Sequence, residues 1–210
     1  MIHKYNSMIR NIIFDLGGVL IDWQPEHMYK KIIQDEQQRK WFLNTVCTME
    51  WNEHQDGGRT IQEANNELLI QYPEHKELIL AYYQRWEEML VGPIQPTVDI
   101  FHTLKKSGNY NIYALTNWSA ETFPRALELF EFLHWFDGRV VSGEEKTRKP
   151  YKEIYDIILT RFSLIPQETI FIDDNKKNIE AAKEVGINCI HFLSPQQLTQ
   201  ELKEKNILLN

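Results

Sequence analysis

The sequence predicts an α/β fold, a doubly wound parallel sheet into which a helical bundle is inserted. Short β-rich runs alternate with amphipathic stretches, an order typical of parallel strands covered by helices on both faces. The runs NIIFD, NIYALT and TIFIDD each end in a polar residue, and ligands bind at that edge of open α/β sheets. The segment between Asp15 and Asn111 is far longer than one crossover needs, which predicts the insertion.

Five segments are expected to form the sheet because they are short, β-rich and bounded by polar or turn residues. They are residues 11–15, 111–116, 139–142, 169–173 and 188–192. Three core helices follow from end signals. One is predicted at 96–107, before Gly108; one starts at Thr122, with Pro124 in its first turn; one runs from 177 to 185 and ends at Gly186.

The inserted segment, 25–90, has helical patterning and no convincing strand. We expect four helices there, at 26–34, 36–47, 60–71 and 74–90, the third opened by Thr60 with Glu63 in capping-box spacing. The stretch VGPIQP at 91–96 is predicted to be the hinge that returns the chain to the core, because glycine and proline stop a helix. The predicted domains are therefore a core of residues 8–22 and 93–210 and a cap of residues 23–92, after a short lead of residues 1–7.

Composition limits the classes of partner. The formal net charge of -7 disfavours nucleic acid or an anionic membrane as the main partner, while a local pocket for a small anion is still permitted. Cys47 and Cys189 stand far apart in no metal-ligand spacing, which favours free thiols in a reducing compartment. With no signal-peptide pattern and no apolar window of membrane-spanning length, we expect a cytoplasmic protein, either a monomer or a weak homodimer.

Four groups of polar residues are predicted to meet at one edge of the sheet. They are Asp15 with Gly17 and Gly18, Thr116 with Asn117, Lys149, and Asp173 with Asp174. Asp15 alone would more simply be a turn or cap residue. Together, converging carboxylates repel each other unless a cation lies between them, and hard oxygen ligands favour Mg²⁺. A metal, a lysine and backbone N–H groups form a site for a phosphate dianion, which a carboxylate can attack to give an aspartyl-phosphate.

Four motifs carry a family resemblance: FDLGGVLID at 14–22, LTN at 115–117, RKP at 148–150, and FIDDNKKNIEAAKEVGI from Phe171. In this order they resemble the haloacid dehalogenase (HAD) superfamily, in the subfamily with a helical C1 cap after the first strand. The wording of the first and last motifs is similar to that of bacterial α-D-glucose-1-phosphate phosphatases. The resemblance implies a Rossmann-like core and a Mg²⁺-dependent phosphomonoesterase of a small soluble phosphometabolite, such as a sugar phosphate.

The resemblance also implies a metal site. Asp15 would be the nucleophile and a Mg²⁺ ligand, Asp174 the second direct carboxylate ligand, and Gly17 a ligand through its backbone carbonyl. Asp173 would bind metal waters or orient the motif lysine. Asn178, at a position that is often Asp in the family, would either support the metal loop by a hydrogen bond or cap the following helix.

A phosphate site follows from the same resemblance. Thr116 and Asn117 would hold the transferring phosphate, together with the glycine turn at Gly18. Lys149 would pair with both the phosphate and Asp15.

The sequence departs from the family pattern at Gly17, where most phosphatases of this superfamily carry an Asp that protonates the leaving group. General acid–base help is typically worth about 10²- to 10⁴-fold. Either another group supplies the proton, or the leaving group needs little help, as in an anomeric sugar phosphate.

The segment EWNEHQDGGRT at 50–60 is expected to be a cap loop over the site, with Glu53, His54 and Arg59 within reach. His54 is our hypothetical substitute acid, although a solvated loop histidine is the plainer interpretation. Trp23 and Trp118 follow motif loops and are candidates for the substrate pocket or for core packing.

Two other functions are compatible with parts of the pattern. In 2-haloacid dehalogenation the same Asp attacks carbon without a metal, but related dehalogenases carry an arginine soon after the first loop, and none occurs between Asp15 and Arg39. A non-catalytic protein that binds a phosphometabolite would explain the missing acid, since fold does not imply activity. Asp22 is expected to cap the first inserted helix, and Arg148 to be a solvated charge.

Overall fold

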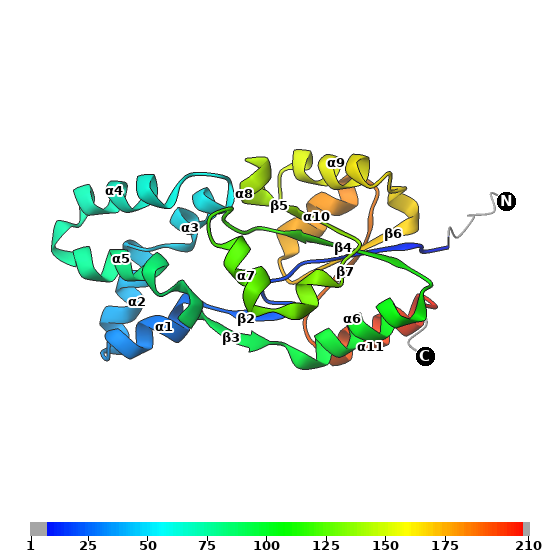
Figure 1. The fold of residues 1–210 in the computed structure, drawn as a ribbon, viewed down its shortest axis with the longest axis horizontal. Helices are drawn as coiled ribbons and strands as arrows, with labels where there is room; N and C mark the ends of the chain where they lie inside the picture. The colour runs from blue at the N-terminus through cyan, green and yellow to red at the C-terminus, as the bar shows by residue number, and fades with distance from the viewer. Residues whose placement is uncertain (1–7, 208–210) are drawn as a thin grey trace.

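A computed structural model describes residues 8–207, so the predicted lead of residues 1–7 and residues 208–210 of the predicted core lie outside the described residues. At its centre is a parallel sheet in the strand order β5-β4-β1-β6-β7 (Figure 1). The strands are β1 (Asn11–Phe14), β4 (Asn111–Thr116), β5 (Gly138–Val141), β6 (Thr169–Asp173) and β7 (Asn188–His191). All five predicted segments join this sheet, and the predicted α/β class is confirmed.

Both faces of the sheet are buried because successive side chains of a strand point to opposite sides. On β1, Ile12 and Phe14 join one apolar cluster and Ile13 joins another. The first cluster includes α6 (Gln95–Ser107), α7 (Phe123–Leu129) and α11 (Pro195–Glu204), and the second includes α9 (Lys152–Arg161) and α10 (Lys176–Glu184). The sheet is therefore doubly wound. The short elements η3 (Glu131–His134), α8 (Ser142–Glu145) and η4 (Pro166–Glu168) complete this part of the chain.

The strand order reverses at β1. From β1 the chain goes to β4 and β5 on one side, and then returns to β6 and β7 on the other. Crevices at the carboxyl end of such a reversal bind ligands in doubly wound sheets. The fold therefore places the end of β1, where Asp15 follows Phe14, at the expected binding position.

A helical insertion follows β1 and lies at one end of the molecule (Figure 1). Its elements are α1 (Pro25–Ile32), α2 (Glu36–Thr45), α3 (Met49–Asp56), α4 (Ile61–Gln71), η1 (Pro73–His75), α5 (Lys76–Gln84) and η2 (Trp86–Met89). It has an apolar cluster of its own, in which the ring centroids of Tyr29 and Phe42 are 5.1 Å apart. The predicted capping box of Thr60 and Glu63 is present at the start of α4.

Two expectations for the insertion are wrong. The segment expected to be a loop at 50–60 holds α3, which begins after Thr48, whose side chain accepts a hydrogen bond from the backbone N–H of Trp51. The helix expected at 74–90 is broken into η1, α5 and η2. It cannot continue to Leu90, because Leu90 is extended and pairs with Trp23.

That pairing joins β2 (Ile21–Trp23) and β3 (Leu90–Pro93) in an antiparallel ribbon, where no strand was expected. The predicted hinge at 91–96 is thus part strand and part the start of α6. Asp22 does not cap α1, whose N-cap is Gln24; its Oδ1 instead lies 3.2 Å from Nε2 of His27.

Three predicted helix ends are confirmed. Thr122 precedes α7, and Gly108 and Gly186 take positive φ angles of 67° and 86° just after α6 and α10. Among residues 8–207, no helix combines the length and apolarity needed to cross a membrane.

Candidate active site

Polar residues that end three parallel strands lie side by side at the carboxyl edge of the sheet. β1 is paired in register with β4 on one side and β6 on the other. Asp15 directly follows β1, while Thr116 and Asp173 are the last residues of β4 and β6. All three are buried, so their charges and hydroxyl must be satisfied by neighbours or by a ligand.

Lys149 joins two of these carboxylates. Its Nζ lies 2.8 Å from Oδ1 of Asp15 and 2.7 Å from Oδ2 of Asp173, and it donates to the carbonyl of Leu115 at 2.9 Å. The three contacts use all the N–H groups of the ammonium. With only 1% of its surface exposed, Lys149 is fixed between Asp15 and Asp173.

The charges of this cluster depend on one another. Burial raises the pKa of Asp15 well above its usual value, with Asp173 and Asp174 adding to the effect and Lys149 opposing it. Burial alone would lower the pKa of Lys149, but the attraction of Asp15 and Asp173 raises it. The lysine therefore stays charged, and the site carries more carboxylates than one ammonium can neutralise.

Asp173 is bonded on both oxygens. Besides Lys149, it accepts from the backbone N–H of Asn175 at 2.7 Å, and from Nδ2 of Asn178 at 3.1 and 3.0 Å on its two oxygens. Asn175, rather than Asn178, caps α10. Asp173 is thus arranged to orient Lys149, and Asn178 to hold Asp173.

A cation fits beside these residues. Asp15, Asp173 and Asp174 each offer an oxygen within 4.8 Å of the others. Since Asp173 is already bonded, Asp15 and the exposed Asp174 are the carboxylates left for direct ligation. Burial raises the pKa of Asp174, and the nearby carboxylate of Asp173 adds to this effect. Added positive charge is therefore favourable at this site. A set of oxygen donors of this kind is what Mg²⁺ requires.

The two glycines after Asp15 differ in what surrounds them. Gly18 has a φ of +73°, and a β-carbon there would lie 2.4 Å from Oδ2 of Asp174. Its backbone N–H donates to the carbonyl of Ile21, so this predicted phosphate-binding donor is already used. A β-carbon on Gly17 would meet no atom within 4 Å. Glycine is therefore required at 18, whereas at 17 it leaves open space.

Thr116 and Asn117 occupy different environments. The Thr116 hydroxyl is buried and has no hydrogen-bond partner among residues 8–207. The Asn117 side chain is fully engaged with the backbone of Lys149, accepting from its N–H at 2.9 Å and donating to its carbonyl at 3.0 Å. Thr116 can therefore donate to a ligand, whereas Asn117 positions the lysine.

Most of these residues open into a pocket between the sheet edge and the helical insertion, which we call the catalytic pocket; Thr116 and Asp173 are not in its lining. From the sheet side its lining includes Asp15, Gly17, Gly18, Asn117, Lys149 and Asp174. Met49, Glu53 and Asp56 contribute from α3. The helix that replaces the predicted loop therefore supplies one wall of the pocket.

The three predicted cap residues lie in different environments. Glu53 lines the pocket and pairs with Arg148, 2.9 Å away, so Arg148 is not the solvated charge expected. Arg59 turns into the insertion, donating to Oε1 of Gln55 at 2.7 Å and pairing with Glu67. His54 is exposed on α3 and is not among the residues that line the catalytic pocket, since the helix directs it away.

Asp56 lies in the pocket and was missed in the sequence. Burial raises its pKa to about 7, Glu53 adds to this, and Arg148 and Lys149 oppose it. Its carboxylate also accepts from the backbone N–H of Ser119 and, at 3.2 Å, from Nδ2 of Asn52. It is one turn beyond Asn52 on α3, so recognising 49–56 as a helix would have drawn attention to it.

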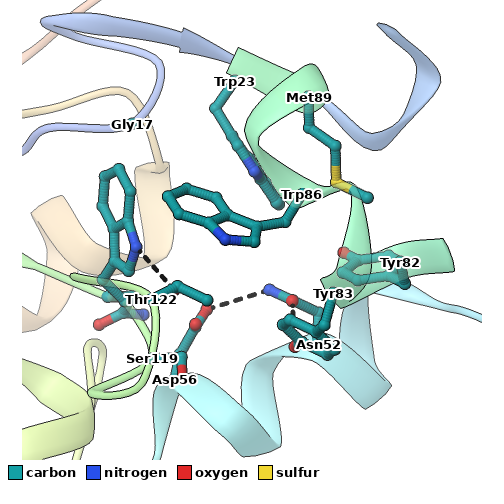
Figure 2. A pocket seen from close by; sticks show the side chains of 12 residues that line it. Gly17, Trp23, Asn52, Asp56, Tyr82, Tyr83, Trp86, Met89, Ser119 and Thr122 are labelled. Atoms are coloured by element: carbon teal, nitrogen blue, oxygen red, sulfur yellow. Dashed lines mark hydrogen bonds between the residues drawn. The ribbon is translucent and has the colours of Figure 1, made fainter. Parts of the chain in front are cut away.

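Both tryptophan candidates line a second cavity next to Gly17 (Figure 2). Trp23 lines this cavity and the catalytic pocket. Trp118 is only 8% exposed, joins the apolar core, and donates from Nε1 to Oγ1 of Thr122 at 3.0 Å. Trp118 is therefore both a core residue and a cavity wall.

The fold and the carboxylate–lysine–carboxylate cluster define a hydrolase of the HAD type. A family model described as haloacid dehalogenase-like hydrolase matches residues 12–192, and the chain belongs to this family. Several of the curated relatives that it matches along most of its length are named as phosphatases. A sesquiterpene phosphatase from Aspergillus oryzae is 29% identical over 195 residues, 91% of this chain and 94% of that protein. A D-ribitol-5-phosphate phosphatase from Bacteroides thetaiotaomicron is 25% identical over 97% of this chain and 100% of that protein.

Solved structures agree on the fold. A HAD family enzyme from Bacteroides thetaiotaomicron, in complex with magnesium and inorganic phosphate, superposes with a TM-score of 0.65, at 24% identity over 87% of this chain and 93% of that one. A HAD-like family hydrolase from Porphyromonas gingivalis gives 0.69, at 20% identity over 94% and 98%. The protein is thus a hydrolase of phosphatase type, while the narrower resemblance to glucose-1-phosphate phosphatases stays a prediction.

Proposed function

We propose that this protein is a Mg²⁺-dependent phosphomonoesterase of a small phosphorylated metabolite and acts through an aspartyl-phosphate on Asp15. The observation that carries the proposal is the buried Lys149, held between Asp15 and Asp173. A buried lysine fixed beside a carboxylate at the ligand edge of the sheet offsets the repulsion between that carboxylate and a phosphate dianion.

Asp15 has one oxygen free to act as nucleophile. Oδ1 accepts from Lys149 and, at 2.7 Å, from the backbone N–H of Leu16. We assign the attack on phosphorus to Oδ2. The Oδ2–P bond forms as the ester P–O bond breaks, and the alcohol oxygen leaves with a proton. Water then cleaves the acyl phosphate, which releases orthophosphate and restores the carboxylate.

The metal site supports this reaction. Asp15, Asp174 and the Gly17 carbonyl would hold Mg²⁺, which when bound offsets the charge on the transferring phosphoryl group. Asp173 contributes by orienting Lys149. We assign to the unpartnered Thr116 hydroxyl a hydrogen bond to a phosphate oxygen, because a buried hydroxyl without a partner is otherwise costly.

Asp56 replaces His54 in our proposal as the proton donor. It lines the catalytic pocket together with Gly17, where the superfamily's usual acid is missing, whereas His54 is not in that lining. A carboxyl with a pKa of about 7 is suited to general acid catalysis near neutral pH, since it is protonated in part and still acidic enough to transfer its proton.

The substrate class stays open at this level. The relatives include a sesquiterpene phosphatase and a D-ribitol-5-phosphate phosphatase, which act on chemically different alcohol groups by their names. The sugar phosphate expected from the sequence is one candidate. The association state, predicted as monomer or weak homodimer, is also a proposal to be measured.

The test is a screen for release of inorganic phosphate from a panel of phosphometabolites with Mg²⁺. We expect release that is abolished by EDTA, restored by Mg²⁺, and lost in Asp15→Asn. Glu74→Gln is a matched carboxylate-to-amide control on the insertion, far from the catalytic pocket lining, and should retain activity.

Two results would point to the alternatives. Phosphate binding with Mg²⁺ but no turnover and no trapped aspartyl-phosphate would support a non-catalytic binding protein. Halide release from a 2-haloacid without Mg²⁺ would support a dehalogenase.

A further inference from the structure

The second cavity, which we call the aromatic cavity, lies between the helical insertion and the sheet edge (Figure 2). Its walls are made mainly by Trp23, Trp86, Trp118, Tyr82, Tyr83 and Met89. Large aromatic side chains and a thioether present apolar, polarisable surface, which binds hydrocarbon and ring groups well. None of these six residues has a role in the phosphate chemistry proposed above.

The walls are held by packing between the two parts of the chain. Trp86 of η2 and Trp118, in the loop after β4, meet edge to face with ring centroids 6.1 Å apart and an interplanar angle of 87°. Tyr82 and Tyr83 lie with centroids 5.0 Å apart on α5. The cavity is therefore a preformed site, which spares a ligand the cost of ordering its walls.

Most polar groups at the cavity are already paired within the protein. The Thr122 hydroxyl accepts from Trp118 (dashed in Figure 2). The Asn52 amide accepts from the Tyr83 hydroxyl at 2.9 Å and donates to Asp56. The Tyr82 hydroxyl differs, because it is buried with no hydrogen-bond partner within residues 8–207. A ligand therefore meets mainly aromatic faces and few polar groups.

The aromatic cavity adjoins the catalytic pocket at Gly17. Gly17, Trp23, Asp56 and Asn117 line both. Since a β-carbon on Gly17 would meet no atom within 4 Å, the missing side chain leaves this junction open. A phosphate monoester with its phosphate at Asp15 can therefore extend its organic part past Gly17 into the aromatic cavity.

We propose that the aromatic cavity binds the leaving group and selects phosphate monoesters of apolar alcohols, prenyl-like or aryl, over polyhydroxylated sugar phosphates. This inference rests on the proposed phosphatase function and adds the substrate class. Each sugar hydroxyl would give up water in a cavity that is mainly aromatic, whereas an apolar group gains from leaving water.

The first test compares kcat/KM for phenyl phosphate and 3-methyl-2-butenyl phosphate with that for glucose 6-phosphate and ribitol 5-phosphate. We expect the apolar esters to be favoured by at least about tenfold, since even small apolar groups are discriminated to this extent in apolar pockets. Trp86→Gln should lower this ratio by about tenfold. Trp41→Ala, at a 44% exposed site on α2, is the control and should leave the ratio unchanged.

The second test measures binding without turnover. Phenol and 3-methyl-2-buten-1-ol, the corresponding alcohols, should quench tryptophan fluorescence in the wild type and not in Trp86→Gln. Trp23→Gln, at another wall residue of the cavity, serves in its place if the melting temperature shows that Trp86→Gln is unfolded. The inference is overturned if the sugar phosphates give an equal or higher kcat/KM, or if no alcohol binds. In either case, phosphate release still upholds the phosphatase proposal. Alcohol binding with no phosphate release from any ester would instead defeat the phosphatase proposal.

Discussion

A β-carbon on Gly18 would lie 2.4 Å from Oδ2 of Asp174, so the loop after β1 and the loop after β6 approach each other as closely as glycine allows. The contact links the first motif to the last across the sheet edge. Because Gly18 also has a φ of +73°, any side chain there adds backbone strain to the steric clash.

The first prediction concerns this contact. Gly18→Ala should displace Asp174, weaken Mg²⁺ binding by at least about tenfold, and destabilise the fold by about 1–3 kcal/mol. Isothermal titration with Mg²⁺ and urea unfolding measure the two effects. Gly17→Ala is the matched control, since its β-carbon has open space, and it should change neither quantity. Equal effects in both variants would contradict the steric argument.

The second prediction concerns Lys149. Lys149→Met should abolish turnover and destabilise the protein by about 3–5 kcal/mol, because Asp15 and Asp173 are then buried without a cation. Lys149 opposes the raised pKa of Asp15, so its loss raises that pKa further, and the variant should recover stability as the pH falls and Asp15 becomes protonated. Urea unfolding at several pH values measures this. Adding Asp173→Asn should restore part of the stability and none of the activity.

Much of this site could be predicted from the sequence because its residues sit at fixed places in the fold. Asp15, Thr116 and Asp173 end strands or directly follow them, and parallel pairing brings strand ends together whatever the intervening segments do. Short β-rich runs located the five strands, and Gly108 and Gly186 located the ends of α6 and α10.

The insertion was harder because its boundaries depend on tertiary contacts. Gly57 and Gly58 suggested a loop over residues 50–60. In the structure, Trp51 and Gln55 are buried one helical turn apart and hold α3 in place. Leu90 looked like the end of a helix until its pairing with Trp23 made it a strand residue. Asp56 was missed for the same reason, since its raised pKa comes from neighbours that only the folded chain supplies.

The third prediction tests Asp56 as the general acid. Asp56→Asn should lower kcat by about 10²- to 10⁴-fold for an ester with a poor leaving group, and much less for p-nitrophenyl phosphate, which needs no proton. The wild-type rate for the poor leaving group should fall above a pH of about 7, as the carboxyl loses its proton, and this limb should vanish in the variant. A pH profile that is unchanged in Asp56→Asn would exclude Asp56.

The same residue should affect stability in a defined direction. Because its folded pKa is raised from 3.8 to about 7, the unfolded chain ionises first as the pH rises, and the folded state is progressively disfavoured between these values. Asp56→Asn removes this loss. The variant should therefore gain stability relative to wild type from about pH 4 to about pH 7, with no further gain above. Thermal unfolding across this range measures the difference, and a constant difference would contradict the raised pKa.

The last prediction returns to Gly17. Gly17→Asp places a carboxyl in open space at the position where the superfamily usually carries its acid, so the variant should fold normally. In an Asp56→Asn background it should restore at least about tenfold of the lost kcat, because the carboxyl at position 17 can then deliver the proton in place of Asp56. The same side chain would stand at the junction of the two cavities and should lower kcat/KM for phenyl phosphate more than for a small ester such as methyl phosphate. Asparagine at 17 separates the two effects, since it blocks the junction without supplying a proton. If Gly17→Asn restores kcat as fully as Gly17→Asp, proton transfer by the introduced carboxyl is ruled out. If Gly17→Asp restores kcat without lowering kcat/KM for phenyl phosphate, the leaving group does not pass Gly17. If Gly17→Asp both restores the proton donor and blocks the route to the aromatic cavity, then the glycine at this position is explained by the access of an apolar leaving group to that cavity.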